Sequence, residues 1–364
     1  MMIGMVLKIA AKILTALLYL VTILSAYGGY IPPRIWVLPS IFVLAFPYLL
    51  ILSVVTGVVW LLCHSFFPAI SAGVVALLCW PVASAAVPVG FSSKPKQPSF
   101  SIMTYNVYEL IDIQHPDYTG PSRTLGYILS TQPDIVCMQE VFRLPEYNKA
   151  KKAQVDSLKE IYPYIIQGKR VGKGLYSPFM LLSKYPAKEV PITWWLFSDC
   201  VMYRIQLPGM PLYVFNVHLT SYMLSDQERK VVSNIRGLRS AERSLKLDKP
   251  IYDKLSTGLR DRQYLAMNIR HVIDSIQGPM VVCGDFNDVP GSYAYRLMRG
   301  DDLKDATAKT NFGPLVTYNA HGLLFQIDHI LYRGDLTPHS VKTGKVKSSD
   351  HYPVEAVFSY HPQR

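Results

Sequence analysis

Acidic residues are absent from the first 97 positions of this 364-residue chain, and only five cationic residues occur there. Soluble domains usually carry about a quarter of their residues as charged side chains, so this stretch is not typical of one. The remaining positions hold 32 of the 37 Lys and Arg residues and all 26 acidic residues, a net charge of +6. The sequence therefore predicts two regions of different character, joined by a Ser-, Pro- and Lys-rich linker at residues 91–99.

Several common motifs are also missing. The five cysteines form neither a C-x-x-C pair nor a His–Cys spacing, which excludes the usual thiolate zinc sites. No G-x-G-x-x-G, Walker lysine loop or G-x-S-x-G elbow stands in a suitable context, so dinucleotide, P-loop and serine-hydrolase sites are not indicated. Cys137 and Cys283 lie in apolar runs and are predicted to be buried free thiols.

Long uncharged runs dominate the first region. Ile13–Ile31, Trp36–Cys63 and Phe66–Val87 each reach the roughly 20 residues that a helix needs to cross a bilayer. His64 and Ser65 alone separate the second run from the third, which predicts a tight helical hairpin. A signal peptide over residues 1–30 would explain only the first run. We therefore expect a transmembrane region of three helices at residues 1–90.

The orientation of these helices stays open. Lys8 and Lys12 compete with Arg34, Lys94 and Lys96, so the positive-inside comparison is nearly balanced.

Short apolar segments with polar ends follow from Phe100 onward and are predicted to be strands. They are SFSIMTYNVY, PDIVCMQEVF, PFMLLSKYP, CVMYRIQL, LYVFNVHLT, PMVVCGDFN, FQIDHILYR and PVEAVFSY. Helical patterns lie between some of them, at Thr119–Thr131 and Asp261–Gln277. Strands alternating with helices, together with adjacent strand pairs, predict an α/β sandwich of mixed sheets in one domain over residues 100–361.

Acidic, amide and imidazole side chains recur where these strands end. They are Asn106, Glu140, His218, Asp285, Asn287, Asp328, Asp350 and His351. Taken singly, each could be a turn residue or a hydrogen-bonded core residue. If the strands share one sheet edge, however, the side chains converge, and Asp285 and Asn287 point to the same side because they are two apart on an extended segment. Asp288 would then point away.

The residue types suit one kind of chemistry. Glu140, assisted by Asn106, offers the hard oxygen ligands that Mg²⁺ or Mn²⁺ prefers, and Mg²⁺ leaves room for a substrate phosphate. The two histidines can donate to phosphate oxygens or relay a proton. Asp285 can orient or deprotonate an attacking water.

Seven short motifs, six of which contain these residues, occur in a fixed order. They are TYNV at 104–107, QE at 139–140, SKYP at 183–186, NVHL at 216–219, GDFND at 284–288, IDHIL at 327–331 and SDHYPV at 349–354. This set resembles the endonuclease/exonuclease/phosphatase superfamily and covers nearly all of residues 98–361. The resemblance implies a four-layered, DNase I-like α/β sandwich that hydrolyses phosphate esters with a divalent metal. The chain is also similar to membrane-anchored bacterial members, which implies a multi-pass protein of the bacterial inner membrane.

The resemblance also implies roles for individual residues. Glu140 would bind the catalytic metal with Asn106 beside it, and Asp350 would approach a metal. Asp285 and Asn287 would position the water and the phosphate. His218 would contact the scissile phosphate, and Asp328 would pair with His351. Whether Asp285 or His351 acts as the general base stays open.

A basic insertion at residues 222–259 lies outside the shared motifs. We expect a helix at Asp226–Leu247 followed by a linker, with Arg236, Arg239 and Arg243 among its cations. Arg170 and Lys173 add charge in the loop GKRVGKG. These five residues are candidates for substrate binding, to anionic lipid headgroups or to a nucleic-acid backbone. The alternative is a solvated helix with no partner.

Together these observations predict a membrane-anchored, Mg²⁺- or Mn²⁺-dependent hydrolase of phosphate esters. The tether favours a lipid substrate in the bilayer, whereas the net positive charge favours a nuclease. A catalytically inactive membrane binding module is a further alternative, because a fold by itself does not guarantee chemistry. No protein partner is inferred.

Overall fold

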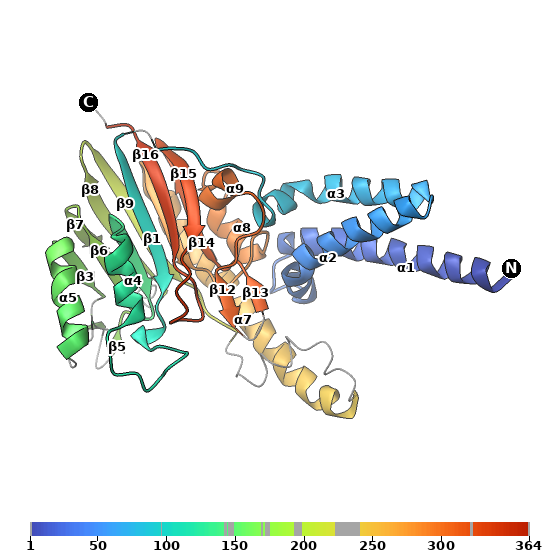
Figure 1. Ribbon diagram of the computed structural model, residues 1–364, viewed down its shortest axis with the longest axis horizontal. Helices are drawn as coiled ribbons and strands as arrows, with labels where there is room; N and C mark the ends of the chain where they lie inside the picture. The colour runs from blue at the N-terminus through green and yellow to red at the C-terminus, as the bar shows by residue number, and fades with distance from the viewer. Residues whose placement is uncertain are drawn as a thin grey trace.

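The chain begins with three long helices, α1 (Met2–Tyr27), α2 (Leu38–Leu62) and α3 (Phe66–Ala86). All three are long and apolar enough to cross a membrane. In the computed structural model they leave the rest of the protein together in one direction (Figure 1). The residues that the structure describes are 2–95, 97–141, 144, 149–168, 170–171, 175–192, 199–222, 241–320 and 323–362.

Hydrogen bonds between polar side chains join α1 to α2, and the Tyr19 hydroxyl of α1 donates to the Pro68 carbonyl of α3 at 3.1 Å. The hydroxyls of Thr22 and Ser53 lie 2.8 Å apart, and Trp60 Nε1 donates to Thr15 Oγ1 at 2.9 Å. Large apolar side chains cover the outside, with Phe67 83% exposed and Leu77 76% exposed. Polar groups inside and apolar groups outside are the arrangement that suits a helix bundle surrounded by lipid.

Two six-stranded sheets form the core of the second region. Sheet one has the order β15-β16-β1-β2-β6-β3 and sheet two the order β11-β14-β10-β9-β8-β7, and both mix parallel and antiparallel pairs. The strands of sheet one are β15 (Leu336–Thr343), β16 (Val354–Tyr360), β1 (Ser99–Asn106), β2 (Ile135–Gln139), β6 (Phe179–Ser183) and β3 (Tyr164–Gln167). Those of sheet two are β11 (Lys304–Asp305), β14 (Asp328–Arg333), β10 (Met280–Asp285), β9 (Met210–His218), β8 (Cys200–Leu207) and β7 (Ala187–Val190).

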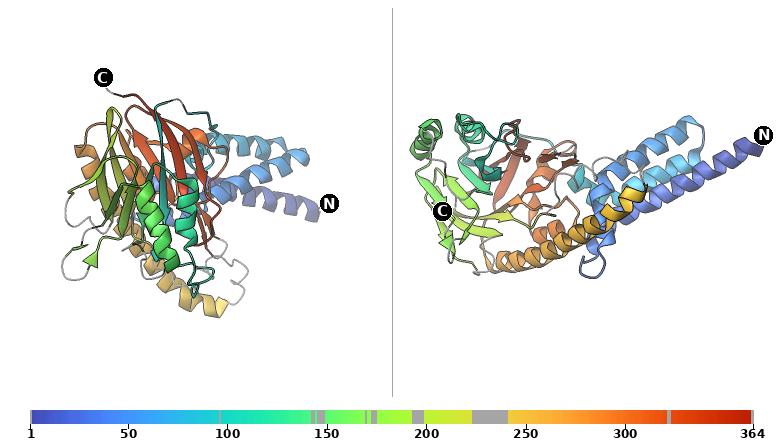
Figure 2. Two further views of the ribbon diagram at one scale, coloured as in Figure 1. Left: turned by 60° about the vertical axis from the view of Figure 1, so that its left-hand side comes forward. Right: turned by 90° about the horizontal axis from the view of Figure 1, so that it is seen from below.

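Helices cover the outer face of each sheet. Packed against sheet one are α4 (Arg123–Thr131) and α5 (Lys149–Ile161), and against sheet two α7 (Ala241–Ser275) and α8 (Tyr293–Arg299) (Figures 1 and 2). Between the sheets lies an apolar core that includes the free thiols of Cys137 and Cys283. The predicted four-layered sandwich, preceded by three helices, is therefore confirmed.

The remaining elements are short. They are η1 (Gly28–Tyr30), η2 (Tyr108–Leu110), α9 (Ala306–Thr310) and the hairpins β4–β5 (Arg170–Val171, Leu175–Tyr176) and β12–β13 (Tyr318–Ala320, Leu323–Phe325).

All eight predicted strands are present, but the sequence analysis missed others. Strand β15 carries Pro338 and lacks a clear apolar alternation, and its pairing with β16 shifts register at Pro338. It lies at the edge of sheet one, where a proline removes no ladder hydrogen bond that the sheet needs. The predicted linker at the end of the basic insertion is wrong, because α7 is one continuous helix from Ala241 to Ser275. The earlier part of the predicted helix, residues 226–240, lies outside the described residues.

Specific contacts fix the three helices against the sandwich. A Cβ at Gly29 would lie 1.9 Å from the Gly291 carbonyl oxygen, so the backbones of η1 and the segment before α8 touch. The Arg296 guanidinium lies 3.1 Å from the centre of the Tyr30 ring. The Tyr48 hydroxyl of α2 donates to the Leu324 carbonyl of β13 at 2.9 Å. The position of α2 relative to the sandwich is therefore defined by direct packing.

Candidate active site

Strand pairing brings the predicted polar residues to one edge of the sandwich. In sheet one, β1 and β2 run parallel, so Asn106 pairs with Gln139 and lies beside Glu140. In sheet two, β10 runs parallel to β9 and antiparallel to β14, so Asp285 faces both His218 and Asp328. Side chains far apart in the sequence thus meet where the two sheets lie against each other.

The Asn106 amide connects the two sheets. Its Nδ2 donates to Glu140 Oε1 at 2.9 Å and to Asp285 Oδ2 at 3.0 Å, and its side chain is buried. His218 Nε2 lies 3.5 Å from Glu140 Oε1 and 3.6 Å from Asp285 Oδ2. Two carboxylates therefore converge on one small volume, with an amide and an imidazole beside them.

The turn after β10 determines the direction in which the side chains of the GDFND motif point. Gly284 has φ +146°, and a Cβ there would lie 1.9 Å from the Val217 carbonyl oxygen, so only glycine fits between these strands. The backbone N–H of Asn287 donates to Asp285 Oδ1 at 2.8 Å, and Asn287 Nδ2 donates to the Leu219 carbonyl at 2.7 Å. Asp285 and Asn287 both line the cleft, as predicted, but the segment is not extended as expected: Asn287 has φ +50°, so the turn aligns the two side chains.

Asp288 turns the other way, into the protein. Its Oδ2 lies 3.5 Å from Nε of Arg262, whose side chain is fully buried and whose Nη1 donates to the Thr220 carbonyl at 3.0 Å. Burial raises the pKa of Asp288, and the Arg262 charge opposes that rise. This buried pair holds α7 against the turn that carries Asp285 and Asn287.

His351 and Asp328 form a second buried pair. His351 Nδ1 and Asp328 Oδ2 lie 2.9 Å apart, and His351 Nε2 lies 3.5 Å from Asp285 Oδ2. Burial lowers the pKa of His351, but the charges of Asp328, Asp285 and Asp350 outweigh it and raise that pKa to about 10. Burial also raises the pKa of Asp328, against the opposing His351 charge. The imidazole is therefore held in its charged form, with Nε2 directed toward Asp285.

Unusual backbone conformations cluster around these groups. Glu140, Asn287 and Tyr108 have φ values of +54°, +50° and +46°, in the left-handed region that non-glycine residues rarely adopt. Such strain is common at functional sites, because surrounding packing has to hold it in place.

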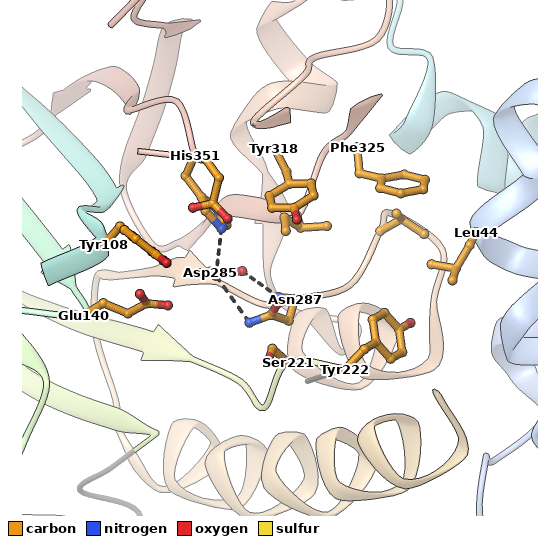
Figure 3. Close-up of a pocket in the computed structure, with 13 residues that line it drawn as sticks. Leu44, Tyr108, Glu140, Ser221, Tyr222, Asp285, Asn287, Tyr318, Phe325 and His351 are labelled. Carbon is orange, nitrogen blue, oxygen red and sulfur yellow. Dashed lines mark hydrogen bonds and ion pairs between the residues drawn. The ribbon is translucent and has the colours of Figure 1, made fainter. Parts of the chain in front are cut away.

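A cleft of about 150 Å³ opens at this edge (Figure 3). Five of the predicted site residues line it: Glu140, Asp285, Asn287, Asp350 and His351. The other lining residues were not predicted; they are Leu44, Tyr108, Ser221, Tyr222, Val289, Tyr318, Phe325 and Ile327. Several of these residues are close to the motifs in the sequence, and this proximity could have been used to predict that they line the cleft. Leu44 lies in α2, and nothing in the sequence connected it with the cleft.

Comparison with known proteins identifies the family. The sequence profile described as Endonuclease/Exonuclease/phosphatase family matches residues 103–351. The chain belongs to this family. The predicted superfamily and its DNase I-like fold are thus confirmed, and the chain is a member of a family of phosphoester hydrolases, whereas the bacterial origin stays a prediction. Residues 8–85 match the profile of a domain of unknown function, DUF8431. No curated protein sequence matches the chain.

Solved structures of the family are similar in fold. An endonuclease/exonuclease/phosphatase from Beutenbergia cavernae is 16% identical with a TM-score of 0.46, covering 72% of each chain. A humanized D. rerio TDP2 is 17% identical with a TM-score of 0.47, covering 72% of this chain and 99% of its own. ANGEL2, described as a 2',3'-cyclic phosphatase, is 16% identical with a TM-score of 0.43, covering 71% of this chain and 95% of its own.

The donor set of this family member can accommodate a metal ion. Ligand atoms of Asp285, Asp328 and His351 all lie within 4.8 Å of one another, so this buried group could hold a metal. Asp328 Oδ1 is buried and has no hydrogen-bond partner among the described residues, and a cation would satisfy it. The His351 nitrogen Nδ1, in contrast, is engaged by Asp328, which leaves carboxylate oxygens as the better ligands. Oxygen ligands suit Mg²⁺ or Mn²⁺.

The structure describes two of the five predicted basic residues. Arg170 lies in β4 and Arg243 in α7, where the structure describes the backbone alone. Lys173, Arg236 and Arg239 lie outside the described residues. A basic lip beside the site therefore stays a prediction.

Proposed function

We propose that the protein is a membrane-anchored phosphodiesterase or phosphatase that depends on Mg²⁺ or Mn²⁺. The observation that carries this proposal is the bridge from Asn106 Nδ2 to Glu140 and Asp285, which gathers carboxylates from both sheets beside His218 and His351. The proposal of an anchor rests on three helices long and apolar enough to span a bilayer.

Glu140, Asn106 and Asp350 are the proposed metal ligands. Glu140 and Asp350 both line the cleft, which gives the cation access to substrate. Half a turn of the Asn106 amide would exchange Nδ2 for Oδ1 and offer an oxygen at the same place. When bound, the metal would polarise a phosphoryl oxygen as a Lewis acid.

The other polar residues of the site are proposed to transfer protons and to stabilise charge. Asp285 is held by the N–H of Asn287 and lines the cleft, so it can orient a water and accept its proton. His351 Nδ1 is engaged with Asp328, so Nε2 is the nitrogen that can donate to a phosphate oxygen. His218 offers a second donor, and Asn287 Nδ2 helps to hold the loop. This geometry favours Asp285 as the base and His351 as the donor.

The test uses the full chain in detergent with bis-p-nitrophenyl phosphate and p-nitrophenyl phosphate. We expect turnover with Mg²⁺ or Mn²⁺ that EDTA abolishes, and a fall in kcat of at least about 100-fold in Glu140→Gln. Glu160→Gln, on the exposed face of α5, is the matched control and should behave as the unaltered protein. Turnover that neither EDTA nor Glu140→Gln reduces would refute the metal-dependent mechanism. A folded protein with no turnover of either soluble substrate would indicate a strictly membrane-presented substrate or the inactive binding module.

A further inference from the structure

The cleft has two chemically different ends. Glu140, Asp285, Asp350 and His351 form the polar end, and an apolar wall of Leu44, Val289, Phe325 and Ile327 forms the other. Figure 3 shows Glu140 and Asp285 on one side, Tyr318 in the middle, and Phe325 and Leu44 on the side of the pale blue helix. A ligand that fills this cleft has to be amphiphilic.

The apolar wall continues into a helix that is suited to span a membrane. Val43 and Leu44 of α2 pack with Val289, Ile327 and Phe325 of the sandwich in one apolar cluster. The Tyr48 ring meets Phe325 edge-on with centroids 6.5 Å apart, one turn further along α2. The helix therefore supplies part of the cleft and leads away from it.

The position of Leu44 along α2 determines how deep it would lie in a bilayer. It lies six positions after the start of the helix at Leu38, which is about 9 Å at 1.5 Å per residue. The headgroup region of a bilayer is roughly 5–8 Å thick on each side, so if the bilayer surface lies at Leu38, this level is close to the boundary between headgroups and hydrocarbon. Trp36, 56% exposed, lies just before this helix, where interfacial aromatic residues commonly lie.

The wall carries no cation to hold a nucleic acid. Among the 13 residues that line the cleft in the described part of the chain, none is Lys or Arg. Nucleic-acid binding depends on cations that neutralise successive phosphates, and an apolar wall offers none. The two ends of the cleft instead match a phosphate headgroup joined to an apolar chain.

We propose that the substrate is a phospholipid resident in the same bilayer, with its phosphate at Asp285 and His351 and its apolar part along Leu44 and Phe325. This inference rests on the proposed phosphoesterase function and names its substrate class. In the reaction the water oxygen bonds to phosphorus, one P–O ester bond breaks, and the released alkoxide takes up a proton. The lipid would reach the cleft sideways along α2, without leaving the membrane.

The experiment compares two substrates in four forms of the full chain in nanodiscs. One substrate is the nanodisc lipid, a mixture of phosphatidylglycerol and phosphatidylethanolamine followed by ³¹P NMR, and the other is soluble bis-p-nitrophenyl phosphate. The proteins are the unaltered chain, Leu44→Ala, Phe325→Ala and the control Leu52→Ala, which lies on the same helix, is 51% exposed and does not line the cleft. Because the readout is the ratio of lipid to soluble turnover, a general loss of folded protein cancels.

We expect the ratio to fall about tenfold in Leu44→Ala and in Phe325→Ala, the effect typical of removing a few apolar contacts to substrate. Leu52→Ala should leave it unchanged. Soluble turnover with no lipid turnover, or with a ratio that neither cleft variant alters, would overturn the inference while the proposed function stands. Preference for a DNA or RNA oligonucleotide, with activity falling steeply in salt, would overturn it in favour of a nuclease. Absence of turnover on every substrate would refute the proposed function, and this inference with it.

Discussion

Replacing Asp328 with asparagine tests how the site holds its imidazole in the charged form. The asparagine keeps the shape of the side chain and can still accept the hydrogen bond from His351 Nδ1, but it removes the charge 2.9 Å away. With the charged partner present, the pKa of His351 is about 10 despite its burial. Without it, we expect that pKa to fall toward the ordinary value of about 6.5.

The consequence is a shift of the alkaline limb of activity to lower pH. If donation from protonated His351 is required, activity declines as the pH rises through its pKa, so lowering the pKa moves this decline down. With a pKa near 6.5 only about a tenth of the molecules are protonated at pH 7.5, so kcat/KM should fall about tenfold there and recover toward pH 6. In the unaltered protein activity should persist to about pH 9.

The assay is the pH profile of kcat/KM on bis-p-nitrophenyl phosphate from pH 5.5 to 9.5 with saturating Mg²⁺. Asp274→Asn, which alters an exposed carboxylate on α7, is the control and should leave the profile unchanged. An Asp328→Asn profile that keeps the alkaline limb of the unaltered protein would refute the electrostatic role. Equal loss at every pH would instead indicate that Asp328 acts only by positioning the ring.

Three further predictions concern other parts of the site. Gly284→Ala should lower Tm by at least about 5 °C in a thermal unfolding experiment, because its Cβ would overlap the Val217 carbonyl; an unchanged Tm would contradict this packing. Glu140→Gln should raise the Mg²⁺ concentration for half-maximal activity by at least about tenfold, and an unchanged midpoint would exclude Glu140 as a ligand. Arg262→Met should destabilise by about 3–5 kcal/mol in denaturant unfolding because it leaves a buried carboxylate unpaired, and adding Asp288→Asn should recover part of this; additive losses would argue against coupling.

Local pattern was enough to predict most of the sandwich. Each of the eight predicted strands either alternates between apolar and polar residues or is continuously apolar. Burying such side chains against a core requires the extended geometry of a strand. Strand β15, with its proline and mixed polarity, gave no such signal, because an edge strand is stabilised mainly by its neighbour. The continuous α7 was misjudged for another reason: Ile251, Leu255 and Leu259 recur at four-residue intervals before Asp261, a helical spacing that the predicted linker overlooked.

The polar part of the site was also accessible from the sequence. Asn106, Glu140, Asp285 and His351 lie at or next to strand ends, and strands in one sandwich have to end at its edges, so their convergence could be expected. Tertiary structure alone decided which atoms meet. The amide of Asn106 reaches Asp285 across 179 positions of sequence, and His351 turns Nδ1 and not Nε2 to Asp328.

The sequence by itself determined that this protein has an apolar three-helix region and a DNase I-like domain with a polar active edge, because hydropathy, period and motif order are properties of local sequence. Only the tertiary structure decided that the two regions share a cleft. Leu44 resembles any other leucine of an apolar helix, and it lines the site because α2 packs against Val289, Ile327 and Phe325. Such packing depends on the shapes of surfaces distant in sequence, which no local pattern records.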